Sequence, residues 1–186
     1  MVVWNHRWEH DKGPDELLAI VTGLVESDVD FTMAMCGEVF VSVPETYDTI
    51  ADRLGDRLVH RGWIEADGYR ELLLGSSVVL STALQEFFGI SVVEAIAAGA
   101  HPVLPDRLVF PERVAALGAD PTASLYDTPS VAVDLIETAL RRPADPALRA
   151  SASSYDWSRV GPAHDRAFSV LASDSPANRD RSPTAY

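Results

Sequence analysis

The chain has 186 residues, 47% of them hydrophobic, and a single Cys. This composition is typical of one soluble domain and excludes a disulfide framework, because Cys36 has no second cysteine to pair with. The formal net charge of −13 argues against a surface that wraps a nucleic-acid duplex unaided, since duplex binding needs a basic stripe.

Short hydrophobic runs alternate with segments of helical periodicity along the whole chain, a pattern typical of βα units around a parallel sheet. In chain order, strands are predicted at Val2–Asn5, Phe31–Cys36, Arg57–His60, Val78–Thr82, Pro102–Leu104 and Leu125–Tyr126. Helices are predicted at Pro14–Val25, Pro44–Leu54, Glu65–Leu74, Ser91–Ala98, Phe110–Leu117, Pro129–Arg142, Pro146–Ser154 and Ser158–Ala172. We therefore expect an α/β fold, a Rossmann-like three-layer sandwich with a mostly parallel sheet. It should occupy residues 1–172 as one domain, with residues 173–186 as a disordered tail rich in Ser, Pro and charge.

Cysteine usage and hydropathy predict a cytoplasmic protein. One unpaired cysteine fits a reducing compartment. The longest uncharged stretch, residues 72–85, is shorter than the roughly 20 residues needed to cross a bilayer, and Met1 leads into apolar residues without a basic segment. We therefore expect contact with neither membrane nor DNA.

The loop after the fourth predicted strand carries the clearest candidate site. Residues 80–99, LSTALQEFFGISVVEAIAAG, run from that strand through Gly89 into a helix, with Glu86 and Glu94 flanking the helix start. Ligands of parallel sheets bind beyond the carboxyl ends of the strands, and the amides of a helix N-terminus favour phosphate. The alternative for Glu94 is a capping box with Ser91 as N-cap, which would need no ligand. Glu86 could likewise be a solvated loop acid, and Phe87 and Phe88 are expected to be core anchors.

A second candidate lies just past the first strand, where Arg7 and Lys12 occur in the segment WNHRWEHDK, residues 4–12. A guanidinium binds two phosphate oxygens at once and an ammonium adds a point charge, so the pair suits a diphosphate. The alternative is a pair of surface cations bridging to Glu9 or Asp11.

Other patterns favour no cofactor. Asp28 and Asp30 precede the second strand and so lie at its wrong end, and His6 and His10 have no third ligand beside them, so we expect no metal. Neither a Walker loop, nor G-x-G-x-x-G after the first strand, nor G-x-S-x-G is present. His60 and Gly62 could line a nucleotide base or could simply turn the chain.

These segments resemble the donor-binding half of retaining GT-B glycosyltransferases, whose E-x7-E element matches Glu86 and Glu94 and whose upstream Arg and Lys match Arg7 and Lys12. The segments WNHRWEHDK, GEVF with VP after it, STALQEFFGISVVEA and LVFPE look like the tRNA-queuosine α-mannosyltransferase family within that group. The similarity runs from Val3 to about Leu171.

The resemblance implies a role for each matched residue. Arg7 and Lys12 would neutralise the leaving nucleotide diphosphate, Glu86 would contact the sugar, and Glu94 would accept hydrogen bonds from the ribose. The backbone amides of Phe88, Gly89 and Ile90 would bind the donor. Transfer would proceed with retention and without a metal, from GDP-mannose to queuosine-modified tRNA.

Members of the resembling family also carry an N-terminal lobe that shapes the acceptor site, and we expect this chain to lack it. That absence predicts an exposed apolar patch that includes part of the helix Ser158–Ala172. Two other functions stay open: a non-catalytic module that binds a nucleotide sugar or a partner, and a glycosyltransferase with another donor and a small-molecule or lipid acceptor.

Overall fold

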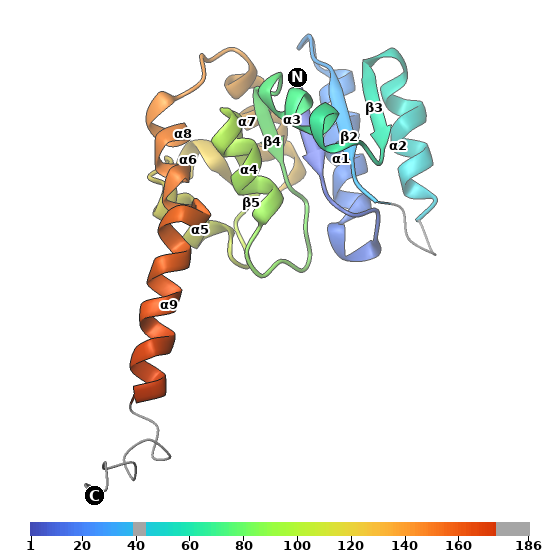
Figure 1. The fold of residues 1–186 in the computed structure, drawn as a ribbon. Helices are drawn as coiled ribbons and strands as arrows, with labels where there is room; N and C mark the ends of the chain where they lie inside the picture. Colours follow the sequence, from blue (N-terminus) through green and yellow to red (C-terminus); the bar gives the residue numbers. More distant parts are fainter. Residues whose placement is uncertain (39–43, 174–186) are drawn as a thin grey trace, which may run out of the picture. The chain divides into compact units, whose positions relative to one another are not determined.

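The computed structural model describes residues 1–38 and 44–173 (Figure 1). The chain divides after Ala152 into two compact units, and each is described by itself. The single domain expected over residues 1–172 stays a prediction, which this division does not test. Residues 39, 40 and 43 of the resembling segments, and the predicted disordered tail beyond Ser173, lie outside the described residues.

The first unit is built on a six-stranded parallel sheet, which confirms the predicted fold class. Its strands run in the order β3-β2-β1-β4-β5-β6, the order of a doubly wound Rossmann-like sheet. In register, Val2 of β1 lies opposite Met33 of β2 on one side and Val78 of β4 on the other. The bounds are β1 Val2–Asn5, β2 Met33–Cys36, β3 Leu58–Gly62, β4 Val78–Leu80, β5 His101–Pro105 and β6 Leu125–Tyr126.

The helices lie close to their predicted positions. In the first unit they are α1 Pro14–Glu26, α2 Thr46–Leu54, α3 Ala66–Leu74, α4 Ile90–Ala98, α5 Phe110–Leu117, α6 Pro121–Ser124, α7 Pro129–Leu140 and α8 Pro146–Ala152. Short 3-10 turns occur at His10–Lys12 and Gly55–Arg57. The sequence pattern missed α6 and both turns because elements this short show no hydrophobic periodicity.

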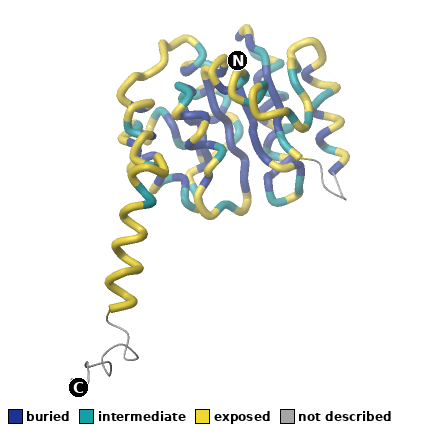
Figure 2. Tube along the Cα trace, viewed as in Figure 1, coloured by how far each residue is buried: buried dark blue, intermediate teal, exposed yellow. Residues whose placement is uncertain are grey.

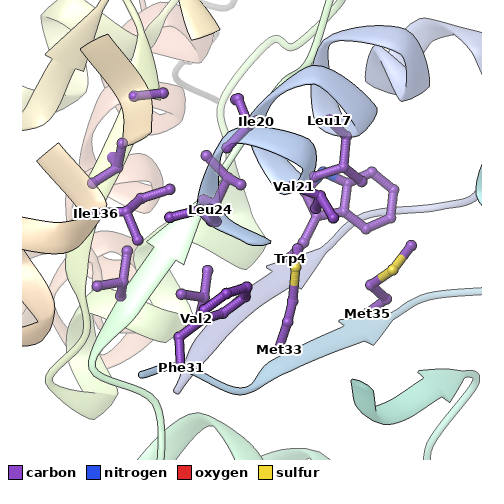
Figure 3. Close-up of a cluster of buried hydrophobic side chains, with 14 of the residues drawn as sticks. Val2, Trp4, Leu17, Ile20, Val21, Leu24, Phe31, Met33, Met35 and Ile136 are labelled. Atoms are coloured by element: carbon purple, nitrogen blue, oxygen red, sulfur yellow. The ribbon is translucent and has the colours of Figure 1, made fainter. Parts of the chain in front are cut away.

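Helices cover both faces of the sheet and make the predicted three layers. On one face, α1, α2 and α7 contribute to a single apolar cluster with the strands. Figure 3 shows Leu17, Ile20 and Leu24 of α1 gathered with Val2 and Met33 of the sheet. The other layer contains α3, α4, α5 and α8, among which α3 packs on α4 and both α4 and α5 pack on α8. Because side chains alternate across a strand and Val3 is as buried as Val2 and Trp4, the central strand is apolar on both faces.

The second unit contains a 3-10 turn at Ser153–Tyr155 and the helix α9, Trp157–Ser173. No described residue of α9 is buried, and Figure 2 shows it exposed along its length. Phe168, Val170 and Leu171 are large apolar side chains among these exposed residues. Within residues 1–38 and 44–173, no helix combines the length and apolar character needed to cross a bilayer.

Candidate functional site

Backbone hydrogen bonds hold two loops together at the carboxyl edge of the sheet. The loop from β1 to α1 accepts from the loop after β4, since the amide of Leu84 donates to the carbonyl of Asp11 at 2.8 Å. The Thr82 hydroxyl donates to the Lys12 carbonyl at 2.6 Å and itself accepts from the indole of Trp4 at 3.1 Å. These contacts bring the two candidate segments, 70 residues apart in the chain, into one site.

Lys12 points into this junction and is only 6% exposed. Its ammonium donates to the Gln85 carbonyl at 2.8 Å and lies 3.4 Å from the Glu86 carboxylate and 3.3 Å from that of Asp11. A buried ammonium is stable only when its charge is paired and its protons are bonded, and these three oxygens satisfy both requirements. The alternative is therefore wrong about the surface location of Lys12, although the ion pair with Asp11 that it named is present.

Arg7 behaves differently. Its side chain is half exposed, and its guanidinium lies 3.3 Å from the Glu9 carboxylate and 4.0 Å from the Asp11 carboxylate. The surface ion pairs that were the alternative to a phosphate site are thus present for this residue. Asp11 lies within 4.0 Å of both cations and so links Arg7 to Lys12 at the same edge.

Glu86 accepts hydrogen bonds from the backbone of its own loop, the one after β4. One carboxylate oxygen accepts from the amides of Phe87 at 3.1 Å, Phe88 at 3.4 Å and Gly89 at 3.1 Å, and the other faces Lys12. Burial raises the pKa of Glu86, but the Lys12 charge and the Gly89 and Phe88 amides outweigh burial and hold the pKa below its usual value. The carboxylate therefore occupies two of the amides expected to bind a donor, and a ligand must displace it to reach them.

The start of α4 shows that the capping-box alternative for Glu94 is wrong. Gly89, in the left-handed conformation at φ 79°, is the N-cap, and no side chain caps this helix. The helix consequently begins at Ile90, one residue before Ser91, so that Ser91 lies inside the first turn and cannot act as the cap. Glu94 instead accepts a hydrogen bond from the Tyr69 hydroxyl at 3.0 Å.

The two phenylalanines are not core anchors as predicted. Phe87 is 97% exposed, and Phe88 is partly exposed with its ring centroid 4.2 Å from the Arg113 guanidinium of α5. The amides of residues 87–89 turn inward onto Glu86, so the side chains of this loop turn outward. The hydrophobicity of a loop residue could not predict this, because the backbone contacts decide it.

A cavity of about 470 Å³ opens beside these loops at the carboxyl ends of β1, β2 and β3. Its lining includes Asn5, Arg7, Trp63, Tyr69 and the carboxylate residues Glu38 and Glu65. His60 and Gly62, suggested as lining a base, lie within β3 and outside this lining. A larger cavity of about 650 Å³ lies at the opposite edge, beside Ser77 and His101, and contains none of the predicted residues.

Asn5 and Tyr69 connect the cavity to Glu94, and the sequence analysis missed both. The Asn5 amide nitrogen donates to the Tyr69 hydroxyl at 3.0 Å and to the Ser91 carbonyl at 2.8 Å. A polar residue closing an otherwise apolar strand was a usable signal for Asn5. Tyr69 had no such signal, because its role depends on α3 packing against α4.

His6 is buried beside Trp4 and Lys12 without a hydrogen-bond partner for its Nε2 among the described residues. Burial, reinforced by the Lys12 charge, lowers the pKa of His6 to about 4. The unfolded chain therefore takes up this proton near pH 6.5 and the folded protein only near pH 4. The free energy of unfolding should fall as the pH drops through this window, by up to about 1.4 kcal/mol per pH unit.

Urea unfolding of the wild type and of His6→Gln at pH 7, 6 and 5 measures this contribution, which the substitution should remove. His10→Gln, which changes an exposed histidine of the same loop, is the matched control and should keep the wild-type slope. Equal slopes in the wild type and His6→Gln would contradict the prediction.

Within the described residues, no group of three or more His, Cys, Asp or Glu side chains is arranged to hold a metal ion. Asp28 and Asp30 precede β2 at its amino end, opposite to the site described above. Transfer without a metal stays a prediction.

An all-parallel sheet of this strand order, with its polar loops and cavity at the carboxyl edge, defines a doubly wound, Rossmann-like α/β domain. The model of the family "Glycosyl transferases group 1" matches residues 1–155, so the chain belongs to this family. The GT-B resemblance is confirmed.

Three relatives illustrate the relationship. The tRNA-queuosine alpha-mannosyltransferase of Drosophila melanogaster is 40% identical over 127 residues, which cover 68% of this chain and 32% of that protein. Sucrose-phosphate synthase from Thermosynechococcus elongatus superposes with a TM-score of 0.78 at 18% identity, covering 94% of this chain and 46% of that one. Anabaena Alr3699/HepE, solved in complex with UDP and glucose, gives 0.72 at 18% identity, covering 92% and 48%. At 18% identity, the two solved structures show the fold alone.

This chain spans about a third of the length of its Drosophila relative.

Proposed function

We propose that this chain is the donor-binding lobe of a cytoplasmic, retaining mannosyltransferase that takes mannose from GDP-mannose and transfers it to queuosine-modified tRNA. The observation that carries the proposal is the contact between Lys12 and Glu86, which joins the two segments of the family's donor site at one edge of the sheet. The name of the Drosophila relative supports mannose as the sugar and tRNA as the acceptor. The acceptor would be held by an N-terminal lobe, which removes the conflict between an acidic surface and RNA.

The arrangement suits departure of a diphosphate. Negative charge developing on the leaving phosphate would be stabilised by the Lys12 ammonium, the Arg7 guanidinium and the amides at the start of α4. Lys12 is fixed by its bond to the Gln85 carbonyl, so it needs little rearrangement to act. On donor binding, Glu86 would leave the amides and accept from a hydroxyl of the sugar.

The cavity supports guanine as the base. Its lining includes Glu38 and Glu65, and carboxylates accept hydrogen bonds only. Guanine offers adjacent N1–H and N2–H donors, whereas uracil offers a single N–H between two carbonyl acceptors. Trp63, 62% exposed at the same cavity, supplies a flat apolar surface for a ring.

Calorimetric titration of the 186-residue chain with GDP-mannose, GDP and UDP-glucose tests donor recognition. GDP-mannose should bind at least about 10-fold more tightly than UDP-glucose, the difference expected for one lost charge-assisted hydrogen bond. Equal affinities for GDP-mannose and UDP-glucose would contradict the guanine assignment. Tighter binding of UDP-glucose would identify UDP-glucose, and not GDP-mannose, as the donor.

A second experiment distinguishes an enzyme from a non-catalytic binder. The chain is joined to the N-terminal lobe of a family member and assayed for mannosylated tRNA with wild-type Glu86 and with Glu86→Gln. Turnover that the substitution abolishes supports transfer, whereas binding of GDP-mannose without turnover of any tRNA supports a binding module.

A further inference from the structure

Glu94 is an exposed side chain on a helix surface, and such a carboxylate samples several rotamers unless another group holds it. Its Oε2 accepts a hydrogen bond from the Tyr69 hydroxyl at 3.0 Å. Tyr69 comes from α3 and Glu94 from α4, so the contact joins two helices that pack against each other. The contact fixes the carboxylate at the side of the cavity that Tyr69 lines.

The direction of this hydrogen bond follows from Asn5. The Ser91 carbonyl can only accept, so the group of Asn5 that lies 2.8 Å from it must be the amide nitrogen. The same nitrogen donates to the Tyr69 hydroxyl at 3.0 Å and occupies a lone pair of that oxygen. The single proton of the phenol is thereby directed to Glu94.

Asn5 is itself held rigidly. It ends β1, is 6% exposed, and is tied to the first turn of α4 through Ser91. Burial and the Glu94 charge also raise the pKa of Tyr69, which keeps the phenol protonated as a donor. The hydrogen bonds from Asn5 to Tyr69 and from Tyr69 to Glu94 therefore fix the Glu94 carboxylate relative to the end of β1.

We propose that Tyr69, oriented by Asn5, is a positioning residue that fixes the Glu94 carboxylate to receive the two ribose hydroxyls of the nucleotide. The inference rests on the proposed function, in which Glu94 binds the ribose. Tyr69 occupies one of about four lone-pair positions of the carboxylate and leaves the others for the diol. Preorganisation of this kind strengthens binding because the side chain is ordered before the ligand arrives.

The test compares GDP with 2′,3′-dideoxy-GDP, which lacks both hydroxyls, in calorimetric titrations of the 186-residue chain. The wild type should bind GDP at least about 10- to 100-fold more tightly than the dideoxy nucleotide, the range for one charge-assisted hydrogen bond. Tyr69→Phe should weaken GDP about 5- to 10-fold and leave dideoxy-GDP within about twofold, so that the ratio of affinities shrinks. In Glu94→Gln, adding Tyr69→Phe should cause no further loss of the ratio, because the two residues act as one unit.

Two further variants distinguish a loss of positioning from a loss of folding. Tyr47→Phe removes a buried hydroxyl that bonds the Glu9 carbonyl and should leave the GDP to dideoxy-GDP ratio unchanged. Should Tyr69→Phe fail to fold, Asn5→Ser removes the donor that orients the Tyr69 hydroxyl, leaves Glu94 in place, and should shrink the ratio in the same way.

The outcomes separate the two proposals. Equal weakening of both nucleotides by Tyr69→Phe, with the ratio still dependent on Glu94, would overturn the positioning role and leave the ribose role of Glu94 intact. A ratio that Glu94→Gln does not change would overturn the ribose role, and the positioning role with it. A wild type that binds neither nucleotide would overturn the proposed function itself.

Discussion

Lys12→Ala is expected to weaken GDP-mannose binding about 10- to 100-fold, because one charge-assisted contact to phosphate is worth about 1.5 to 3 kcal/mol. The ammonium is buried and held at the site by the Gln85 carbonyl. Another cation therefore cannot rotate into its place and restore the lost positive charge. The loss should be measured by calorimetry with GDP-mannose and with GDP. Both should weaken by a similar factor, since Lys12 is assigned to the diphosphate that they share.

The matched control is Arg53→Ala, which removes one positive charge from an exposed ion pair with Glu26 between α1 and α2. It should leave the affinity within about twofold, because the interaction of such distant surface charges is screened at physiological salt. Circular dichroism and a thermal melt must show that Lys12→Ala is folded, since Asp11 and Glu86 then face each other without their cation. A folded Lys12→Ala protein of unchanged affinity would remove Lys12 from the site.

Gly13→Ala is expected to destabilise the first unit severely. Gly13 has φ 64°, and an added Cβ would lie 2.2 Å from the Thr82 carbonyl oxygen, a backbone atom that cannot move alone. Relieving this overlap requires the two loops of the site to separate, with loss of the Thr82 to Lys12 hydrogen bond. We expect a decrease of roughly 3 kcal/mol or more in the free energy of unfolding, comparable to severe overpacking.

Gly118→Ala is a close control for this steric effect. Gly118 has nearly the same backbone angle, φ 71°, but an added Cβ there meets nothing within 4 Å. It should cost only about 1 to 2 kcal/mol, the penalty for placing a side chain in the left-handed region. Urea unfolding of both variants measures the difference, and equal destabilisation would show that the loops can separate at no cost.

The sequence by itself determined the fold class and most of the elements. Short hydrophobic runs and period-3.6 hydrophobicity are local information, so the strand Val2–Asn5 was predicted with the bounds the structure shows, and α5 likewise. The alternation of strands and helices then leaves a parallel sheet with helices on both faces as the natural arrangement. The placement of Lys12 and Glu86 at one edge followed from the same rule, because both follow the carboxyl ends of strands.

Only the tertiary structure decided how those side chains are used. The burial of Lys12 and the link from Asn5 through Tyr69 to Glu94 depend on contacts between residues 25 or more positions apart. The turning of Phe87 to the surface depends on the path of one loop backbone. The position of the α4 N-cap at Gly89 rather than Ser91 depended on a backbone angle that a serine hydroxyl near a helix start does not reveal. Hydrophobic periodicity specifies which face of an element is buried, whereas hydrogen bonds between loops are fixed only when the packed sheet brings those loops together.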